Sequence, residues 1–225
     1  MKALARLYSY NPLALKLVSA TIQTVFDGQI VPFLAQDAIV VPEPILRPLS
    51  QQLEACLPLE QSLMFWLAIW QEPIALCRLQ THLLNANPRD VIGALSRLVE
   101  RSLITRHFLT DEPSFSLQPM VMAFVLDKFV DTIIEEFRQA QQDSSIESFH
   151  QLRTHCLLRP GTDDILGDRI LTLLCNAYFQ QSLPSLSPHL EQWFTLAQQE
   201  APNKMGYLSF NLALVLKMTQ EGRLP

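Results

Sequence analysis

Apolar residues recur every three or four positions along most of this 225-residue chain, which is the spacing of helices with one buried face. Proline and glycine fall mainly between these stretches, where they end helices or form turns. The helices predicted before residue 58 are Lys2–Tyr8, Asn11–Phe26, a short turn or helix at Ile30–Leu34, and Ile45–Leu57. The pattern predicts a mainly helical protein with a single small hairpin.

The stretch Pro58–Pro119 contains three predicted helices followed by a hairpin. Its first helix, Pro58–Trp70, is apolar on nearly all sides, which is typical of a buried helix. A second helix is predicted at Ala75–Leu84, and Asn87-Pro88 has the residue types that favour the start of a third. The predicted strands of the hairpin are Ser102–Phe108 and Ser114–Leu117. This order of elements is that of a winged-helix domain, a relative of the helix-turn-helix.

The chain beyond Pro119 is again helical by its pattern. A long amphipathic helix comes first, and Gln139–Ser145 is predicted to be a polar linker. The further predicted helices are Ile146–Leu158, Ile165–Gln181, Ser187–Gln199 and Lys204–Gln220. We therefore expect a mainly α fold in three parts: a helical subdomain at residues 1–57, a winged-helix domain with a trailing helix at 58–140, and a C-terminal helical bundle or repeat-like extension at 146–225.

Composition narrows the classes of function. The formal net charge of −5 argues against a general nucleic-acid binder, because neutralising phosphates is the main source of affinity for nucleic acid. The four cysteines form no C-x-x-C pair and lie in apolar segments, which predicts reduced core thiols. No run of about 18 apolar residues occurs, so no membrane span is predicted. We expect a cytoplasmic protein.

Several short segments resemble the NB-ARC module of STAND-type signalling ATPases, especially bacterial, cyanobacterial members. Tyr8-Ser9-Tyr10-Asn11-Pro12-Leu13-Ala14-Leu15-Lys16 is similar to the Gly-x-Pro-Leu-Ala segment of that module. Phe115-Ser116-Leu117-Gln118-Pro119-Met120-Val121-Met122 is similar to the end of its winged helix. Phe33-Leu34-Ala35-Gln36 and the helix at Leu59–Trp70 are similar as well. The resemblance covers roughly residues 1–140, about the second half of such a module.

The resemblance implies where a nucleotide would contact this chain. In that family the helical subdomain and the winged helix close over ADP that is bound to a separate α/β domain. Pro12 matches the proline that packs near the adenine, and Tyr10 stands at the preceding glycine. Gln118 stands where the family has a histidine near the phosphate, and glutamine can donate a hydrogen bond without carrying charge. Pro12 and Gln118 are therefore the candidate cofactor-binding residues.

A phosphate-binding P-loop is missing from the chain. Such a loop needs G-x-x-x-x-G-K-[ST], and none of the six glycines lies in that motif. We expect no stand-alone ATPase activity and no cofactor in this chain alone, whereas the resemblance implies ADP or ATP for the complete module. The expected role is a regulatory, protein-interaction fragment of a larger signal-transduction switch. Its expected partner is a nucleotide-binding domain, another protein domain, or a second copy of itself.

A DNA-binding transcriptional regulator with a helical effector region is the alternative. Arg89, Arg97 and Arg101 share one stripe of the predicted helix after Asn87. In a winged-helix domain such a stripe could enter the major groove of DNA. Asp90 and Glu100 dilute its charge, and the whole chain is acidic, so we favour a solvated or interdomain face and do not expect nucleic-acid binding.

The remaining clusters of polar residues do not need a metal site or a catalytic role to explain them. His150, His155 and Cys156 lie close in sequence, but positions i and i+5 do not share a helix face and a fourth zinc ligand is lacking. Asp163, Asp164 and Asp168 come where a helix begins, and acids are favoured there by the helix dipole. We predict neither catalytic residues nor a metal site.

Overall fold

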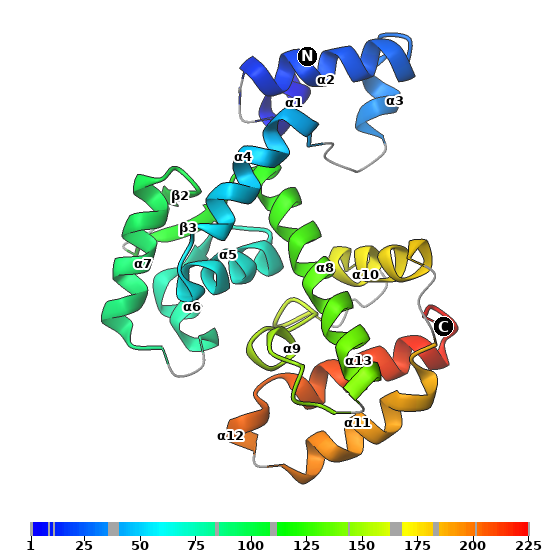
Figure 1. Cartoon of the computed structure of the whole chain (residues 1–225). Coiled ribbons are helices and arrows are strands. Elements are labelled where there is room, and N and C mark those ends of the chain that lie inside the picture. Colours follow the sequence, from blue (N-terminus) through cyan, green and yellow to red (C-terminus); the bar gives the residue numbers. More distant parts are fainter. Residues whose placement is uncertain are drawn as a thin grey trace. The chain divides into compact units, whose positions relative to one another are not determined.

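The computed structural model describes residues 2–8, 10, 12–35, 41–83, 86–108, 112–143, 145–162, 168–181, 185–200 and 202–224. The fold is mainly α with one small antiparallel sheet, as the pattern predicts (Figure 1). The chain forms two compact units. Unit 1 combines Met1–Leu76 with Arg89–Val125, and unit 2 combines Cys77–Pro88 with Leu126–Pro225. The three-part division at residues 1–57, 58–140 and 146–225 stays a prediction.

Unit 1 begins with helices that enclose a small core of their own. These helices are α1 (Lys2–Leu7), α2 (Pro12–Val25), α3 (Ile30–Leu34) and α4 (Glu43–Glu54). The core contains Tyr8, Ala14, Val18 and Phe33, together with Met120 from much later in the sequence. Gly28 follows α2 with a φ of 78°, a left-handed conformation that glycine adopts without a steric cost. The N-terminal segment is therefore packed against the start of the helix that begins at Pro119.

The sheet of unit 1 has one more strand than the sequence predicts. Its elements are α5 (Pro58–Trp70), β1 (Ile74–Ala75), α7 (Pro88–Glu100), β2 (Ile104–His107) and β3 (Ser114–Leu117). The strand order is β1-β3-β2, with Ile74 opposite Phe115 and Ile104 opposite Leu117. β1 comprises two residues and cannot show the alternation that identifies strands. It displaces the second predicted helix, so that α6 runs from Leu76 to His82.

The long helix α8 (Pro119–Asp143) continues through most of the predicted linker. Gln139–Ser145 was expected to be a polar connection, but residues 139–143 are helical and Ala140 is completely buried. Packing of that alanine explains why the helix does not end at Phe137. No helix in the part of the chain that the structure describes is long and apolar enough to cross a membrane.

Unit 2 is built from the last helices of the chain. These are α9 (Gln151–Thr154), α10 (Arg169–Gln180), α11 (Ser187–Gln199), α12 (Pro202–Met205) and α13 (Leu208–Gln220). The rings of Phe137, Phe149 and Trp193 meet in its core, with centroids 5.3 to 6.2 Å apart. The helix predicted at Lys204–Gln220 is divided at Gly206, which has a φ of 52°.

The helix predicted at Ile146–Leu158 is wrong over most of its length. Only Gln151–Thr154 is helical, and the segment around it is irregular although largely buried. Its apolar residues fit a helical period. However, side chains of α8 and α13 form hydrogen bonds with backbone N–H and carbonyl groups of this segment, which would otherwise pair with each other in a helix. The start of the helix predicted at Ile165 lies outside the described residues.

The prediction of core thiols is correct for only some of the cysteines. All four thiols are free: Cys56 and Cys156 are buried, Cys175 is half-buried, and Cys77 is exposed. Cys77 lies in α6, where the apolar neighbours Leu76 and Leu79 turn to other faces of the helix.

Candidate functional site

Pro12 and Gln118 lie at the starts of two helices whose neighbouring residues share one core. Pro12 is the exposed first residue of α2, and Gln118 is half-buried just before α8. The Gln118 carbonyl accepts a hydrogen bond from the Met122 N–H at 2.8 Å, which closes the first turn of α8. Ala14 and Met120, each two residues further along, belong to the same buried cluster. These contacts fix the backbone at both positions to a common core.

Tyr10 has a backbone conformation that glycine favours. Its φ is 56°, which is uncommon for residues with a side chain. The Tyr10 N–H donates to the Ala5 carbonyl at 2.7 Å, and this bond holds the turn at the end of α1. The side chain is 63% exposed and so contributes little burial. The chain therefore has a left-handed turn at the position where the resemblance expects glycine, although the residue is a tyrosine.

A buried carboxylate binds two of the three arginines that the DNA-binding alternative relies on. Arg97 Nε donates to Glu60 Oε1 at 2.5 Å, and Arg101 Nη1 lies 3.6 Å from Glu60 Oε2. Arg101 also donates to the Gln52 carbonyl at 2.7 Å. Two of the three arginines therefore join α7 to α4 and the start of α5, inside unit 1.

Glu60 combines this ion pair with a helix cap. The residue is 2% exposed, and its Oε2 accepts the Leu57 N–H at 3.0 Å at the start of α5. Burial alone would raise the pKa of this carboxyl. The hydrogen bonds from Arg97 and Leu57, with the charges of Arg97 and Arg101, outweigh burial and lower the pKa below its usual 4.5. Glu60 is thus an ionised structural residue at neutral pH.

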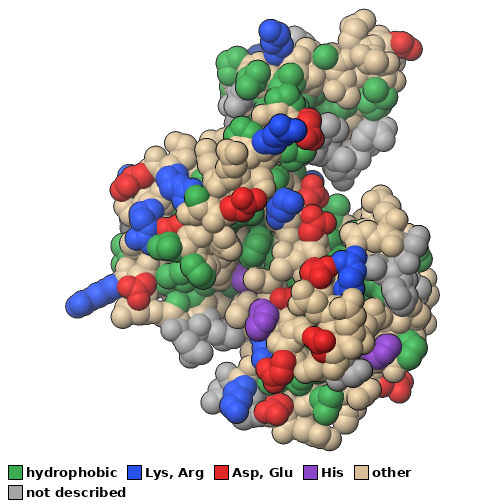
Figure 2. Space-filling model, in the orientation of Figure 1, with side chains coloured by type: hydrophobic (Ala, Val, Ile, Leu, Met, Phe, Trp, Pro, Cys, Tyr) green, Lys and Arg blue, Asp and Glu red, His purple; other side chains and the backbone are tan. Residues whose placement is uncertain are grey.

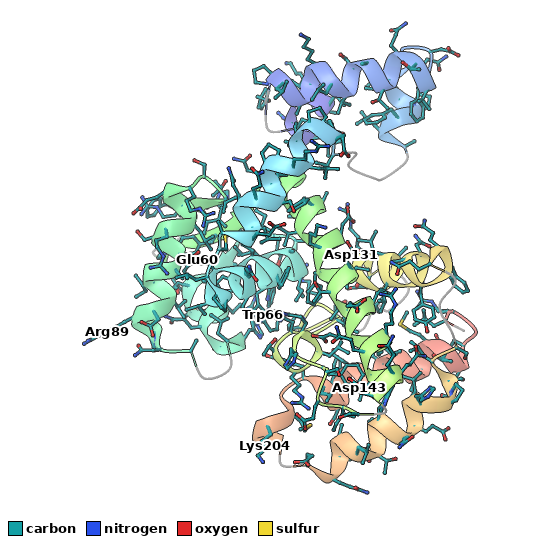
Figure 3. The ribbon with its side chains drawn as sticks, in the orientation of Figure 1. Glu60, Trp66, Arg89, Asp131, Asp143 and Lys204 are labelled. Atoms are coloured by element: carbon teal, nitrogen blue, oxygen red, sulfur yellow. The ribbon has the colours of Figure 1, made fainter. Side chains whose placement is uncertain are left out.

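The other basic residues do not extend this cluster. Arg89 is exposed at the first turn of α7 and points away from the protein (Figure 3). The Arg106 guanidinium lies 4.5 Å from the centroid of the Phe108 ring. His107 Nε2 lies 2.8 Å from Ser116 Oγ on the neighbouring strand. The structure therefore brings Arg97 and Arg101 together and leaves Arg89 apart from them.

His155 and Asp168, from the two polar clusters of unit 2, have structural environments. His155 is 1% exposed and its ring packs edge-on against Phe129, with centroids 5.6 Å apart. Asp168 caps α10 by accepting the Ile170 and Leu171 N–H groups at 2.8 and 3.1 Å. Asp163 and Asp164 lie outside the described residues. Among the residues that are described, no group of three His, Cys, Asp or Glu side chains could hold a metal ion.

Sequence reasoning missed Asn211, a buried amide that organises unit 2. Its Oδ1 accepts the Leu157 N–H at 2.9 Å, and its Nδ2 donates to the Leu152 and His155 carbonyls at 2.8 and 2.7 Å. The side chain is completely buried in α13. An asparagine within an apolar helical stripe was the available signal, since a buried amide must find partners.

Glu136 is an acidic residue of α8 that is buried and not on the solvated face of this helix. It is 5% exposed, and its carboxylate accepts the N–H groups of His150, Gln151 and Leu152 at 2.9, 2.5 and 3.3 Å. Burial raises the pKa of this carboxyl to about 7, against the lowering effect of those three bonds and of the Arg153 charge. Glu136 and Asn211 together hold the irregular segment between α8 and α13.

Comparison with known proteins finds a distant similarity. No protein-family model matches the chain, and no solved structure matches it. The chain is 28% identical over 248 aligned residues to an uncharacterized WD repeat-containing protein of Nostoc sp. (strain PCC 7120). The match covers 95% of this chain and 19% of that protein, so the chain spans about a fifth of the length of its relative.

Proposed function

We propose that this chain is a regulatory segment of a STAND-type nucleotide switch, closing over ADP that a separate nucleotide-binding domain holds. The observation that supports this most is the core that Ala14 shares with Met120. The two segments that resemble the nucleotide-facing parts of an NB-ARC module are far apart in sequence. This core packs them together, and a lid that senses one ligand requires that they move as one body.

The mechanism is a shift between two conformations. A ligand can bias such an equilibrium only if it binds one conformation more tightly than the other. In the proposed closed conformation, Pro12 contacts the base and Gln118 contacts the phosphates. The open conformation lacks both contacts. ADP would then favour closure, and exchange of the nucleotide would release the lid.

The partner in this proposal is a protein domain. Tyr10 and Leu13, on either side of Pro12, are 63% and 54% exposed. Exposed apolar side chains around a candidate contact favour an interaction surface. The relative from Nostoc is described as a WD repeat-containing protein, and a multi-part protein of that kind is consistent with a role in protein interaction.

Any nucleotide hydrolysis is carried out by the separate P-loop domain. The chain has no P-loop, and hydrolysis needs the backbone cradle and lysine that this motif supplies. We therefore propose a cytoplasmic, non-catalytic segment whose nucleotide contact is made jointly with the P-loop domain.

DNA binding receives no comparable support. Glu60 neutralises much of the charge of Arg97 and Arg101, and the protein is acidic overall. Figure 2 shows Lys and Arg side chains interspersed with Asp and Glu on the face that it draws, without a continuous basic surface. Phosphate neutralisation, the main source of affinity for DNA, is therefore weak here.

The test first asks whether the genomic sequence upstream of this chain encodes a P-loop polypeptide, and then combines that polypeptide with this chain. We expect no ADP binding to the chain alone, and tighter ADP binding to the mixture than to the P-loop polypeptide alone. Gln118→Ala should remove most of that gain, whereas Gln51→Ala, an exposed glutamine of α4, should leave it unchanged. The proposal fails if no such P-loop polypeptide is encoded, or if the purified chain shifts duplex DNA specifically at physiological salt.

A further inference from the structure

An apolar pocket lies in unit 1 between α7 and the sheet. Its volume is about 280 Å³, and one wall consists of Ile92, Leu95, Ser96 and Val99 from α7. These positions follow the i, i+3, i+4, i+7 spacing of a single helix face. The facing wall is formed by Leu76, Pro113, Phe115 and Arg106. The pocket is thus an apolar space between a helix and a sheet with one cationic side chain.

The strand register explains why Arg106 lies at this pocket. Arg106 is opposite Phe115 in the β2–β3 pair, and residues opposite each other project from the same face of a sheet. The guanidinium packs against the ring of Phe108, which is 70% exposed. Within the described ranges, no carboxylate forms an ion pair with Arg106. Ser96, by contrast, already donates its hydroxyl hydrogen to Glu100 at 3.2 Å.

Apolar walls, together with a cation that has no acidic partner among the described residues, are complementary to one kind of ligand. Ligand pockets are typically about 300–1,000 Å³ and mostly apolar, with a few polar groups that orient the ligand. This pocket is slightly smaller than that range, so it fits a body about as large as a phenyl ring on a short alkyl chain. A carboxylate on such a body can form a charge-assisted, bidentate bond with a guanidinium.

We propose that this pocket binds a small amphipathic carboxylate. The apolar body lies between Leu95, Val99 and Phe115, and the carboxylate is bound by Arg106. The inference is independent of the nucleotide-switch role, because the pocket includes neither Pro12 nor Gln118. It assigns a role to an arginine that the Glu60 cluster leaves out.

The test is a titration of the methyl-labelled protein with phenylbutyrate, followed by NMR. The methyl signals of Ile92, Leu95 and Val99 should shift in a saturable way. Phenylbutylamine has the same apolar body with a positive charge and should bind more weakly. In Arg106→Gln the affinity for phenylbutyrate should fall about fivefold or more, since an exposed charge-assisted bond is lost.

Arg89→Gln is the matched control. It removes an exposed arginine of α7 that does not line the pocket, and it should leave the affinity unchanged. Retained methyl signals elsewhere in unit 1 verify that both variants fold. The proposal is overturned if phenylbutyrate shifts none of the three methyl groups, if the amine binds equally well, or if both arginine variants weaken binding alike. Equal shifts by inorganic phosphate alone would also overturn it, because the apolar body would then be irrelevant.

Discussion

Arg97 Nε and Glu60 Oε1 form an ion pair with a separation of 2.5 Å, and this pair connects the last turn of α7 to the first turn of α5. The carboxylate is buried whereas the Arg97 side chain is 48% exposed, so the pair lies at the boundary between the interior of unit 1 and solvent. The relationship explains why a basic stripe occurs in an acidic protein. Two of its three arginines, Arg97 and Arg101, bind the internal carboxylate of Glu60.

Glu60→Gln should therefore destabilise unit 1. The amide keeps the size of the side chain but loses the charge that binds Arg97 and Arg101, at a cost of about 2 kcal/mol in the free energy of unfolding. Urea titration of both proteins at neutral pH measures this difference. Glu100→Gln, an exposed acid at the end of α7, is the control and should change stability by less than about 0.5 kcal/mol.

Acid should reduce the difference between wild type and Glu60→Gln. The pKa of Glu60 is lowered in the folded state, so its stabilising contribution is present above pH 4.5 and is lost as the pH falls through the lowered value. Urea titrations repeated between neutral pH and pH 3 measure this convergence. A gap that remains constant over this range would show that ionisation of Glu60 does not stabilise the fold.

Glu136 should give unit 2 the opposite pH dependence. Its pKa is about 7 when folded and 4.5 ordinarily, so the native state retains a proton that the unfolded state releases between those values. Stability should therefore fall as the pH rises through this window, by up to about 3 kcal/mol, and level off above it. Glu136→Gln should abolish this slope, while Glu135→Gln, at a half-buried site of α8, should retain it. Thermal unfolding from pH 4.5 to pH 8 distinguishes the variants.

Asn211→Ala should be the most damaging single substitution proposed for unit 2. It leaves the Leu157 N–H and the carbonyls of Leu152 and His155 without their partner in a buried site, at an expected cost of about 2–4 kcal/mol. Asn176→Ala, on an exposed face of α10, serves as the control. Amide hydrogen exchange should report faster exchange at residues 150–157 in the first variant only. Unchanged protection there would mean that Asn211 does not hold this segment.

Tyr10→Gly should stabilise the protein. A residue with a side chain is strained at a φ of 56°, and little apolar surface is lost because the ring is 63% exposed. The relief exceeds the extra chain entropy of glycine and should amount to about 0.5–1 kcal/mol. Tyr10→Ala should not show this gain, since alanine keeps the strain. If both substitutions lower the melting temperature by the same amount, the contacts of the Tyr10 ring stabilise the fold more than the strained backbone destabilises it.

The local pattern predicts helices well where a proline marks the first turn of an apolar segment. The helices at Pro58–Trp70 and Ser187–Gln199 are found with the predicted bounds. The pattern fails at Ile146–Leu158, where two buried polar side chains from distant helices bind the backbone. A bond between residues 54 positions apart, such as Leu157 to Asn211, leaves no periodic signal near the segment that it shapes.

The candidate sites show the same limit. Spacing places Arg89, Arg97 and Arg101 on one stripe, but only the fold reveals that Glu60 lies beneath two of them. Glu136 looks like one more acid on a polar face because its burial depends on residues 150–152. Charge patterns in a single sequence predict which residues can pair, whereas the partners come from tertiary packing.

The proposed role requires that Pro12 and Gln118 contact a nucleotide jointly with a separate P-loop domain. The most direct test is calorimetric titration of this chain with a P-loop polypeptide, where the genomic sequence upstream encodes one, with and without saturating ADP. The account predicts that ADP tightens the association at least tenfold, about 1.4 kcal/mol, and that Gln118→Ala removes most of that gain. Association that is equally tight without ADP, or no association in either condition, would contradict it.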